Sequence, residues 1–290
     1  MRAPEAYAPV PLAEAGVEPV ETAPTGAVAA LAWAGLASTL HRVRRGEGAL
    51  LAVNLSLVGC LGASPGRALA QAAISMIAIA LMYAFNDLYD APTDWNNPKK
   101  DRGVIAAYIE HRQVGVVALV VLKLLTVAIA FLALGPGSAA VVTGVMLVNV
   151  VYSMVLKGVP VADVAWVWLW GALYAGIAGA PASLIAVVGL MTSVCHLFQT
   201  LDDRRADAEV GIRTTAVRSP VLARNVLCVL SLLLFVALAP ALGVASALTA
   251  FVPLGLFFLA SRPGVAWLLT KAYFAVVWLA LLGMVPGAAA

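Results

Sequence analysis

Two clusters of carboxylates hold most of the chemistry that this sequence offers. Each cluster follows a long apolar run, and together they hold eight of the 15 acidic residues of the 290-residue chain. The eight are Asp87, Asp90, Asp94, Asp101, Asp202, Asp203, Asp207 and Glu209. Carboxylates at the end of an apolar, membrane-crossing helix are costly, and such residues usually have a function. We therefore expect both clusters to belong to a functional site.

The spacing of the first cluster predicts a single helical face. Asn86, Asp90 and Asp94 follow one another at intervals of four residues, and Asp87 lies beside that face. Pro92 predicts that the helix bends or ends nearby, which would place Asp94 on a loop. This part of the chain should present several oxygen ligands in one direction.

The second cluster has matching geometry, because Asp203 and Asp207 are also four residues apart. Carboxylates that share a face repel one another unless a cation lies between them, and hard oxygen ligands suit Mg²⁺. Two facing clusters would hold a diphosphate between metal ions. Nearby basic residues could contact its oxygens: Lys99, Lys100, Arg102, Arg204, Arg205 and Arg213. Solvated loop charges are the alternative, and the matched spacing of two clusters argues against it.

The composition predicts that the chain is an all-α integral membrane protein, and that its helices position these clusters. The chain is 62% hydrophobic and 11% charged, with a mean hydropathy of +0.96, whereas soluble domains carry about 25% charged residues. Residues 1–25 are rich in Pro, Ala and Glu and predict a disordered tail. Residues 26–290 are expected to form one membrane domain. With a net charge of +3 and no dense basic stretch, nucleic acid is not an expected partner.

Nine apolar runs have lengths near that of a membrane-spanning helix, which is about 20 residues. Turn-forming Pro and Gly residues separate several of them. The expected spans are 47–64, 67–87, 114–135, 138–156, 162–180, 182–201, 221–242, 245–260 and 265–286.

The distribution of basic residues predicts the orientation of these nine spans. If the spans alternate in direction, almost every Lys and Arg in the connecting segments falls on one side, and only Arg67 falls on the other. Basic loops stay in the cytoplasm. The N-terminus and both acidic loops should therefore be cytoplasmic, capping a lipid-accessible cavity, and the C-terminus should lie on the opposite side. A bacterial inner membrane is the expected location.

These motifs resemble those of the UbiA-type intramembrane prenyltransferases. That family has an N-D-x-x-D-x-x-x-D motif after its second helix and a D-x-x-x-D motif after its sixth, within nine helices. Here the motifs are Asn86-Asp87-x-x-Asp90-x-x-x-Asp94 and Asp203-x-x-x-Asp207. Two further stretches are similar to the family, and they are Tyr152-Ser153-x-x-Leu156-Lys157 and Gly211-Ile212-Arg213-Thr214-Thr215.

The resemblance implies Mg²⁺-dependent transfer of a prenyl group from a prenyl diphosphate to an unidentified aromatic or lipid acceptor, by ionisation of the allylic diphosphate. It implies two or more Mg²⁺ ions and membrane lipid around the protein. The implied metal ligands are Asn86, Asp87, Asp90, Asp94, Asp203 and Asp207, of which Asp90, Asp94, Asp203 and Asp207 are catalytic. The implied diphosphate-binding residues are Lys99, Lys100, Arg102, Lys157 and Arg213.

Two other functions stay open. Many family members continue the first motif with Arg-Pro and a Ser-Gly pair, but here Gly103 and Ala106-Ala107 occupy those positions. Because of this difference, a second function stays open, which is that of a terpene cyclase acting on the prenyl diphosphate alone. An ion-coupled transporter is less favoured, because transporter ion sites usually lie near the bilayer midplane and these carboxylates lie at one face.

Aromatic residues near the clusters could shield a carbocation with their ring faces. Location at the membrane interface is the alternative explanation for them. The candidates are Tyr83, Phe85, Tyr152, Trp166, Trp168, Trp170 and Tyr174.

Overall fold

The computed structural model describes residues 26–44, 47–61, 63–95, 97, 100–260 and 262–284. The predicted disordered tail at 1–25 lies outside these residues, and within them the chain forms helices and no strands. The first seven helices in chain order are α1 (Ala27–Arg44), α2 (Ala49–Cys60), α3 (Pro65–Asp94), α4 (Arg102–Glu110), α5 (Arg112–Leu134), α6 (Pro136–Val151) with a π-helical turn η1 (Tyr152–Leu156), and α7 (Ala162–Gly176). The others are α8 (Ala182–Asp202), α9 (Arg204–Glu209), α10 (Thr215–Arg218), α11 (Pro220–Leu242), α12 (Val244–Ala247), the 3₁₀ turn η2 (Leu248–Phe251), α13 (Val252–Leu259) and α14 (Pro263–Leu282).

Six of the described helices are long and apolar enough to cross a membrane: α3, α5, α6 with η1, α8, α11 and α14. The other three predicted spans coincide with shorter helical segments, which are α2, α7 and the stretch Val244–Leu259. All nine apolar runs are therefore helical, but only six reach spanning length in the described part of the chain. The predicted count of nine transmembrane helices is supported only to that extent.

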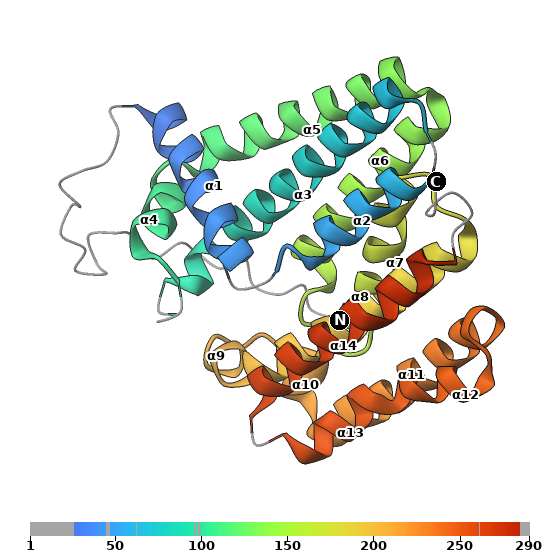
Figure 1. Cartoon of the computed structure of the whole chain (residues 1–290). Coiled ribbons are helices and arrows are strands. Elements are labelled where there is room, and N and C mark those ends of the chain that lie inside the picture. The colour runs from blue at the N-terminus through green and yellow to red at the C-terminus, as the bar shows by residue number, and fades with distance from the viewer. Residues whose placement is uncertain are drawn as a thin grey trace.

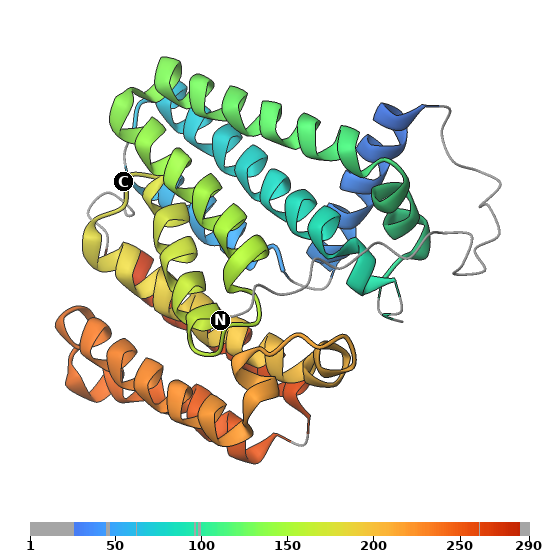
Figure 2. The same cartoon turned by 180° about the vertical axis from the view of Figure 1, so that it is seen from behind.

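The helices form two halves, each with its own apolar core. In one half, α3, α5 and α6 pack together, with α1 and α4 lying across the C-terminal end of α3 (Figure 1). In the other, α8 packs against α11 and α14, and α13 contacts α11 and α14, with α11 in orange at the bottom of the view in Figure 2. α7 joins the halves, because it contacts both α6 and α8. A site between the halves can therefore take residues from helices far apart in the sequence.

The first acidic motif lies on a helix rather than on a loop. α3 continues through Pro92 to Asp94, so the prediction that Asp94 sits on a loop was wrong. A proline inside a helix removes one backbone hydrogen bond but does not always end the helix. The Thr93 hydroxyl donates to the Asp90 carbonyl at 2.8 Å within this last turn. All four polar residues of the motif thus keep helical positions.

α7 and α8 approach each other closely at two glycines. A Cβ atom added to Gly189 on α8 would lie 2.7 Å from the Trp168 carbonyl oxygen on α7. A Cβ added to Gly171 on α7 would collide with the Thr192 side chain on α8. Small residues at such positions allow backbones to pack together inside a membrane. This contact places α8, which leads into the second acidic motif, against the helix that joins the two halves.

Candidate active site

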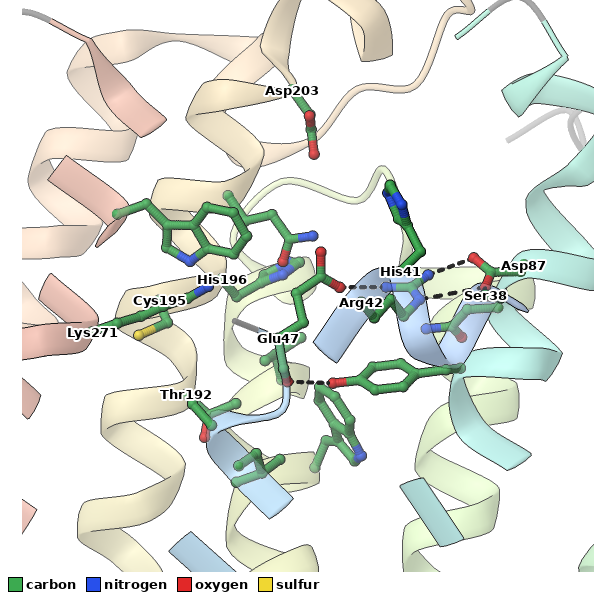
Figure 3. A pocket seen from close by; sticks show the side chains of 18 of the residues that line it. Ser38, His41, Arg42, Glu47, Asp87, Thr192, Cys195, His196, Asp203 and Lys271 are labelled. Atoms are coloured by element: carbon green, nitrogen blue, oxygen red, sulfur yellow. Dashed lines mark hydrogen bonds and ion pairs between the residues drawn. The ribbon is translucent and has the colours of Figure 1, made fainter. Parts of the chain in front are cut away.

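A cavity of about 830 Å³ lies between the two halves, and both acidic motifs line it. Arg42 and Asp87 form one wall, and His196, Cys195 and Lys271 lie on another, with Asp203 at the end of the cavity (Figure 3). The motifs are more than 100 residues apart in the sequence and meet because α3 and α8 both end at this cavity. The prediction that the two clusters face each other across one site is consistent with this geometry.

Lysines neutralise two of the carboxylates of the first motif. The Lys157 ammonium lies 2.5 Å from Asp90 Oδ2, and the Lys100 ammonium lies 3.0 Å from Asp94 Oδ2. Burial by itself lowers the pKa of Lys157, but the neighbouring carboxylates, Asp90 first among them, raise it above its usual value. Lys157 follows the π-helical turn η1, and turns of this kind are frequent at functional sites.

Asp87 has a different environment, because donors from α1 and from Lys100 occupy both of its oxygens. Arg42 lies 2.5 Å from Oδ1 and 3.4 Å from Oδ2, and the Ser38 hydroxyl also donates to Oδ2. Lys100 lies 3.3 Å from Oδ1. Arg42 is held in turn by Glu47 at 2.7 Å. The Asp87 carboxylate therefore ties α1 to the end of α3.

The second motif is built by the turn between α8 and α9. Asp203 connects the two helices, and the Asp207 amide donates to the Asp203 carbonyl oxygen at 2.9 Å. Burial raises the pKa of Asp207 to about 6, and the charges of Asp203, Asp90 and Asp94 add to this increase, while Lys157 opposes it. The four carboxylates thus repel one another across the cavity.

This donor set fits Mg²⁺. Among the described residues, no three His, Cys, Asp or Glu side chains lie close enough to hold a metal ion by themselves. Mg²⁺ usually takes only one or two protein carboxylates and fills its other positions with water and phosphate oxygens. The repulsion felt by Asp207 is the kind that a bound cation relieves. The carboxylates present are therefore suited to a metal that arrives with an anionic substrate.

The predicted basic residues divide into three groups. Lys100 and Lys157 line the cavity beside the carboxylates. Arg102 and Arg213 are exposed and are not among the residues that line it. Lys99 lies outside the described residues. Of the predicted basic residues that the structure describes, only Lys100 and Lys157 are therefore placed to contact an anion in this cavity.

Aromatic side chains form part of the lining of the cavity. Of the candidates from the sequence, the ones that line the cavity are Tyr83, Tyr152, Trp166 and Trp170, and the ones that do not are Phe85, Trp168 and Tyr174. The sequence reasoning missed Trp267, Phe274 and Trp278 of α14, which also line it. Nothing in the sequence marks these three residues, because α14 carries no acidic motif.

Sequence reasoning also missed the part that α1 plays. Arg42 precedes the first predicted span and was not among the predicted site residues, but its guanidinium lies inside the site, 4.6 Å from the centre of the Tyr83 ring. Tyr83 in turn donates to the Glu47 carbonyl at 2.8 Å (Figure 3). The only available signal was a charged residue after a short apolar run, which is common in membrane proteins.

A buried carboxylate holds the segment that follows the second motif. Asp163, at the start of α7, is fully buried, accepts from the Thr215 amide at 2.8 Å and also accepts from the Thr215 hydroxyl. Thr215 also accepts from the Val161 amide at 2.7 Å. We expect Asp163→Ala to lower the free energy of unfolding by about 2 kcal/mol or more, because two buried donors lose their acceptor.

Thermal unfolding of the purified protein in detergent checks this prediction. The matched control is Glu110→Ala, which removes a carboxylate whose side chain is 61% exposed and should change stability little. Equal melting temperatures for the two variants would contradict the role assigned to Asp163.

Comparisons with known proteins agree with this fold. The model of the UbiA prenyltransferase family matches residues 49–282. A UbiA homolog from Archaeoglobus fulgidus bound to DMAPP and Mg²⁺ is 19% identical, with a TM-score of 0.59, covering 85% of this chain and 99% of that one. The homolog bound to GPP and Mg²⁺ is 18% identical, with a TM-score of 0.58, covering 84% of this chain and 99% of that one. The homolog bound to Cd²⁺ is 17% identical, with a TM-score of 0.56, covering 85% of this chain and 99% of that one.

At this level of identity, the solved structures establish a shared fold. No curated protein sequence matches the chain. The family model, however, covers most of the chain and includes both acidic motifs, while α1 lies before the matched residues. With its six long apolar helices, the chain is an integral membrane protein, and it belongs to the UbiA prenyltransferase family.

Proposed function

We propose that this protein transfers a prenyl group from a prenyl diphosphate to a small aromatic or lipid acceptor within the membrane. The observation that carries the proposal is that two acidic motifs and two lysines line one cavity between the helical halves. The Archaeoglobus fulgidus homolog, which has the same fold, has been solved with DMAPP, GPP and Mg²⁺. A diphosphate with an isoprenoid tail matches a cavity that is lined by both charged and aromatic side chains.

In this proposal the carboxylates and lysines have separate roles. Asp90, Asp94, Asp203 and Asp207 would hold two or more Mg²⁺ ions, and Lys100 and Lys157 would donate to diphosphate oxygens. Asp87 has both oxygens occupied by protein donors, so we assign it to positioning α1 against the site. When bound, Mg²⁺ would neutralise the charge that develops on the leaving diphosphate.

The chain's own residues account for the rest of the chemistry. Lys100 and Lys157 stabilise the negative charge that grows as the allylic C–O bond breaks, in a site where water is scarce. The faces of aromatic rings such as Tyr152, Trp166 and Trp170 stabilise the positive charge left on the prenyl group. Apolar walls exclude water, so the acceptor rather than water attacks the cation.

The proposal also places the site at the cytoplasmic face of a bacterial inner membrane. The basic residues of the connecting segments support this orientation, because Lys and Arg are retained in the cytoplasm. In that arrangement a soluble diphosphate product would leave directly into the cytoplasm.

The deciding experiment measures diphosphate release and identifies every product. Purified protein in lipid nanodiscs is incubated with Mg²⁺ and prenyl diphosphates of several lengths, with and without aromatic and lipid acceptors, followed by mass spectrometry. Transfer predicts a prenylated acceptor. A terpene from the donor alone would identify a cyclase instead, and no diphosphate release in any combination would refute both reactions.

Removal of the metal gives a separate prediction. We expect a chelator of divalent cations to lower diphosphate release by about a hundredfold or more, because the leaving group then departs without a neutralising cation. Adding Mg²⁺ in excess of the chelator should restore the rate. Release that continues unchanged in the chelator would show that the carboxylates have another role.

A further inference from the structure

The helix α1 has two faces with different surroundings. Its buried positions are Ala30, Ala34 and Ser38, which are four residues apart and therefore share one face of the helix. The opposite face carries large apolar side chains that are exposed, and we call this set the outer face: Val28, Trp33, Leu36 and Val43. An exposed apolar surface of this kind marks a site that binds a membrane or another molecule. The outer face therefore needs an occupant.

The contacts of α1 place it at one end of the helical bundle. α1 packs on α3, α4 and α5 and runs across the C-terminal end of α3 (Figure 1). A Cβ added to Gly35 would lie 3.8 Å from the Tyr108 hydroxyl oxygen on α4, and one added to Gly115, near the start of α5, would lie 3.4 Å from Leu31. With 30 residues, α3 is longer than the roughly 20 that cross a bilayer, so its charged last turns reach the membrane surface. α1 therefore lies at the level of that surface.

Membrane lipid is the occupant that adjoins the outer face. α5 is a spanning helix with only 22% of its apolar window buried, and its exposed apolar side chains begin at Val114 and Val116, beside the contact with α1. α1 contains no Asp or Glu, and its apolar part, 27–40, is shorter than a spanning helix, which needs about 20 residues. Trp33 is of a residue type that is enriched at membrane interfaces. These are the properties of a helix that lies in the plane of the membrane surface.

We propose that α1 is an in-plane helix that seats its outer face in the phospholipid leaflet next to the acidic motifs, and that this leaflet thereby holds Ser38 and Arg42 against Asp87. Ser38 lies on the buried face, opposite the outer face, so one helix contacts lipid on one side and the site on the other. Arg42 donates to both Asp87 oxygens and is bound by Glu47. The position of α1 thus determines which charges surround Asp87, whatever reaction the cavity catalyses.

The first experiment measures the depth of Trp33 in the bilayer. Purified protein is placed in nanodiscs whose acyl chains are brominated either near the headgroup or near the chain end. The chain has seven Trp residues, so the fluorescence lost in Trp33→Phe is taken as the signal of Trp33. We expect bromine near the headgroup to quench this signal about twofold or more strongly than bromine near the chain end, and aqueous iodide to quench it little.

Two further reporters give the comparison for this measurement. Leu36→Trp, made in the Trp33→Phe protein, should show the same quenching as Trp33, because both positions belong to the outer face. Glu209→Trp is the matched control on α9, where the Glu209 side chain is 65% exposed. Iodide rather than bromine should quench this control.

A second experiment tests whether the leaflet holds α1 in place. Leu36→Glu puts a charge into the outer face at a position that is 61% exposed, so it opposes contact with acyl chains without opening a cavity in the core. We expect the backbone amides of 27–44 to exchange hydrogen about tenfold faster or more in nanodiscs, because α1 then opens more easily. Leu259→Glu makes the same change on α13, at a position that is 84% exposed, and should leave exchange in α1 unchanged.

Each other outcome overturns a defined part of the inference. Quenching by iodide and not by bromine would place the outer face in water, and quenching by neither would show that protein, such as a second copy of the chain, covers it. Stronger quenching by bromine near the chain end would show that α1 is inserted deeply and does not lie in the plane of the surface. If bromine quenches as expected but Leu36→Glu exchanges as slowly as the wild type, the leaflet contacts α1 without holding it. If Leu36→Glu does not fold, the uncharged Leu36→Gln replaces it, with faster exchange again expected and unchanged exchange again contradicting the hold.

Discussion

Asp90→Asn and Asp203→Asn should each lower the rate of diphosphate release by about a hundredfold or more, while leaving the protein folded. Asparagine has the size of aspartate and can still accept the hydrogen bond that Lys157 donates to position 90. The change therefore removes a negative charge from the cavity without opening a void. The two substitutions lie on different helices, so equal losses would indicate that both motifs act on the same substrate.

Release of diphosphate in single-turnover experiments, together with thermal unfolding, checks this expectation. Glu209→Gln is the matched control, because Glu209 is on α9 close to the second motif but pairs with Arg205 on the exposed side, with 65% of its side chain accessible. Its activity should stay within about twofold of the wild type, as surface substitutions have small effects. Full activity in either Asp90→Asn or Asp203→Asn would remove that residue from the metal-binding set.

Gly189→Ala should produce the largest loss of stability from the addition of a single methyl group. The new Cβ would lie 2.7 Å from the Trp168 carbonyl oxygen and 2.9 Å from two atoms of the Trp168 ring. A carbonyl oxygen within a helix cannot move without displacing the helix, so α7 and α8 must separate. Overpacking of this kind costs about 1–3 kcal/mol. Because α8 leads into Asp203, activity should fall together with stability.

Gly255→Ala on α13 provides the control, because a Cβ added there meets nothing within 4 Å. Alanine is the better helix former, so this variant should be as stable as the wild type or slightly more stable. Thermal unfolding of both variants in the same detergent gives the comparison. If Gly189→Ala had the same melting temperature as Gly255→Ala, the contact between α7 and α8 would be shown to relax around the added methyl group.

The positions of the six long apolar helices and of the acidic motifs could be predicted from the sequence, whereas α1 and α4 were not among the predicted spans. Apolar runs of sufficient length must form helices in a bilayer, because no water is present to satisfy the backbone. The four-residue spacing then placed Asp90 and Asp94 on one face of α3, and it placed Asp203 and Asp207 one turn apart where α8 leads into α9. The error at Pro92 arose because a proline predicts a break, whereas α3 continues two residues further, to Asp94.

Which residues share the cavity depended on contacts that no local pattern records. Arg102 and Arg213 were among the basic candidates predicted from the sequence, because they follow the acidic motifs closely, but Arg42 was not. The fold brings Arg42 against Asp87, because α1 packs on α3 and α4. It leaves Arg102 and Arg213 exposed, because neither side chain faces the gap between the halves.

The sequence by itself determined a helical membrane protein with two oxygen-rich motifs suited to a metal and a diphosphate, because length, hydropathy and spacing are local properties of the chain. Only the tertiary structure decided how each motif residue is used. Asp87 is engaged by α1, Asp90 is paired with Lys157, and Asn86 accepts a hydrogen bond from Asn149, which accepts one from Lys123. These roles depend on the direction of each hydrogen bond and on which helices pack together, and both are set by contacts between segments distant in the sequence.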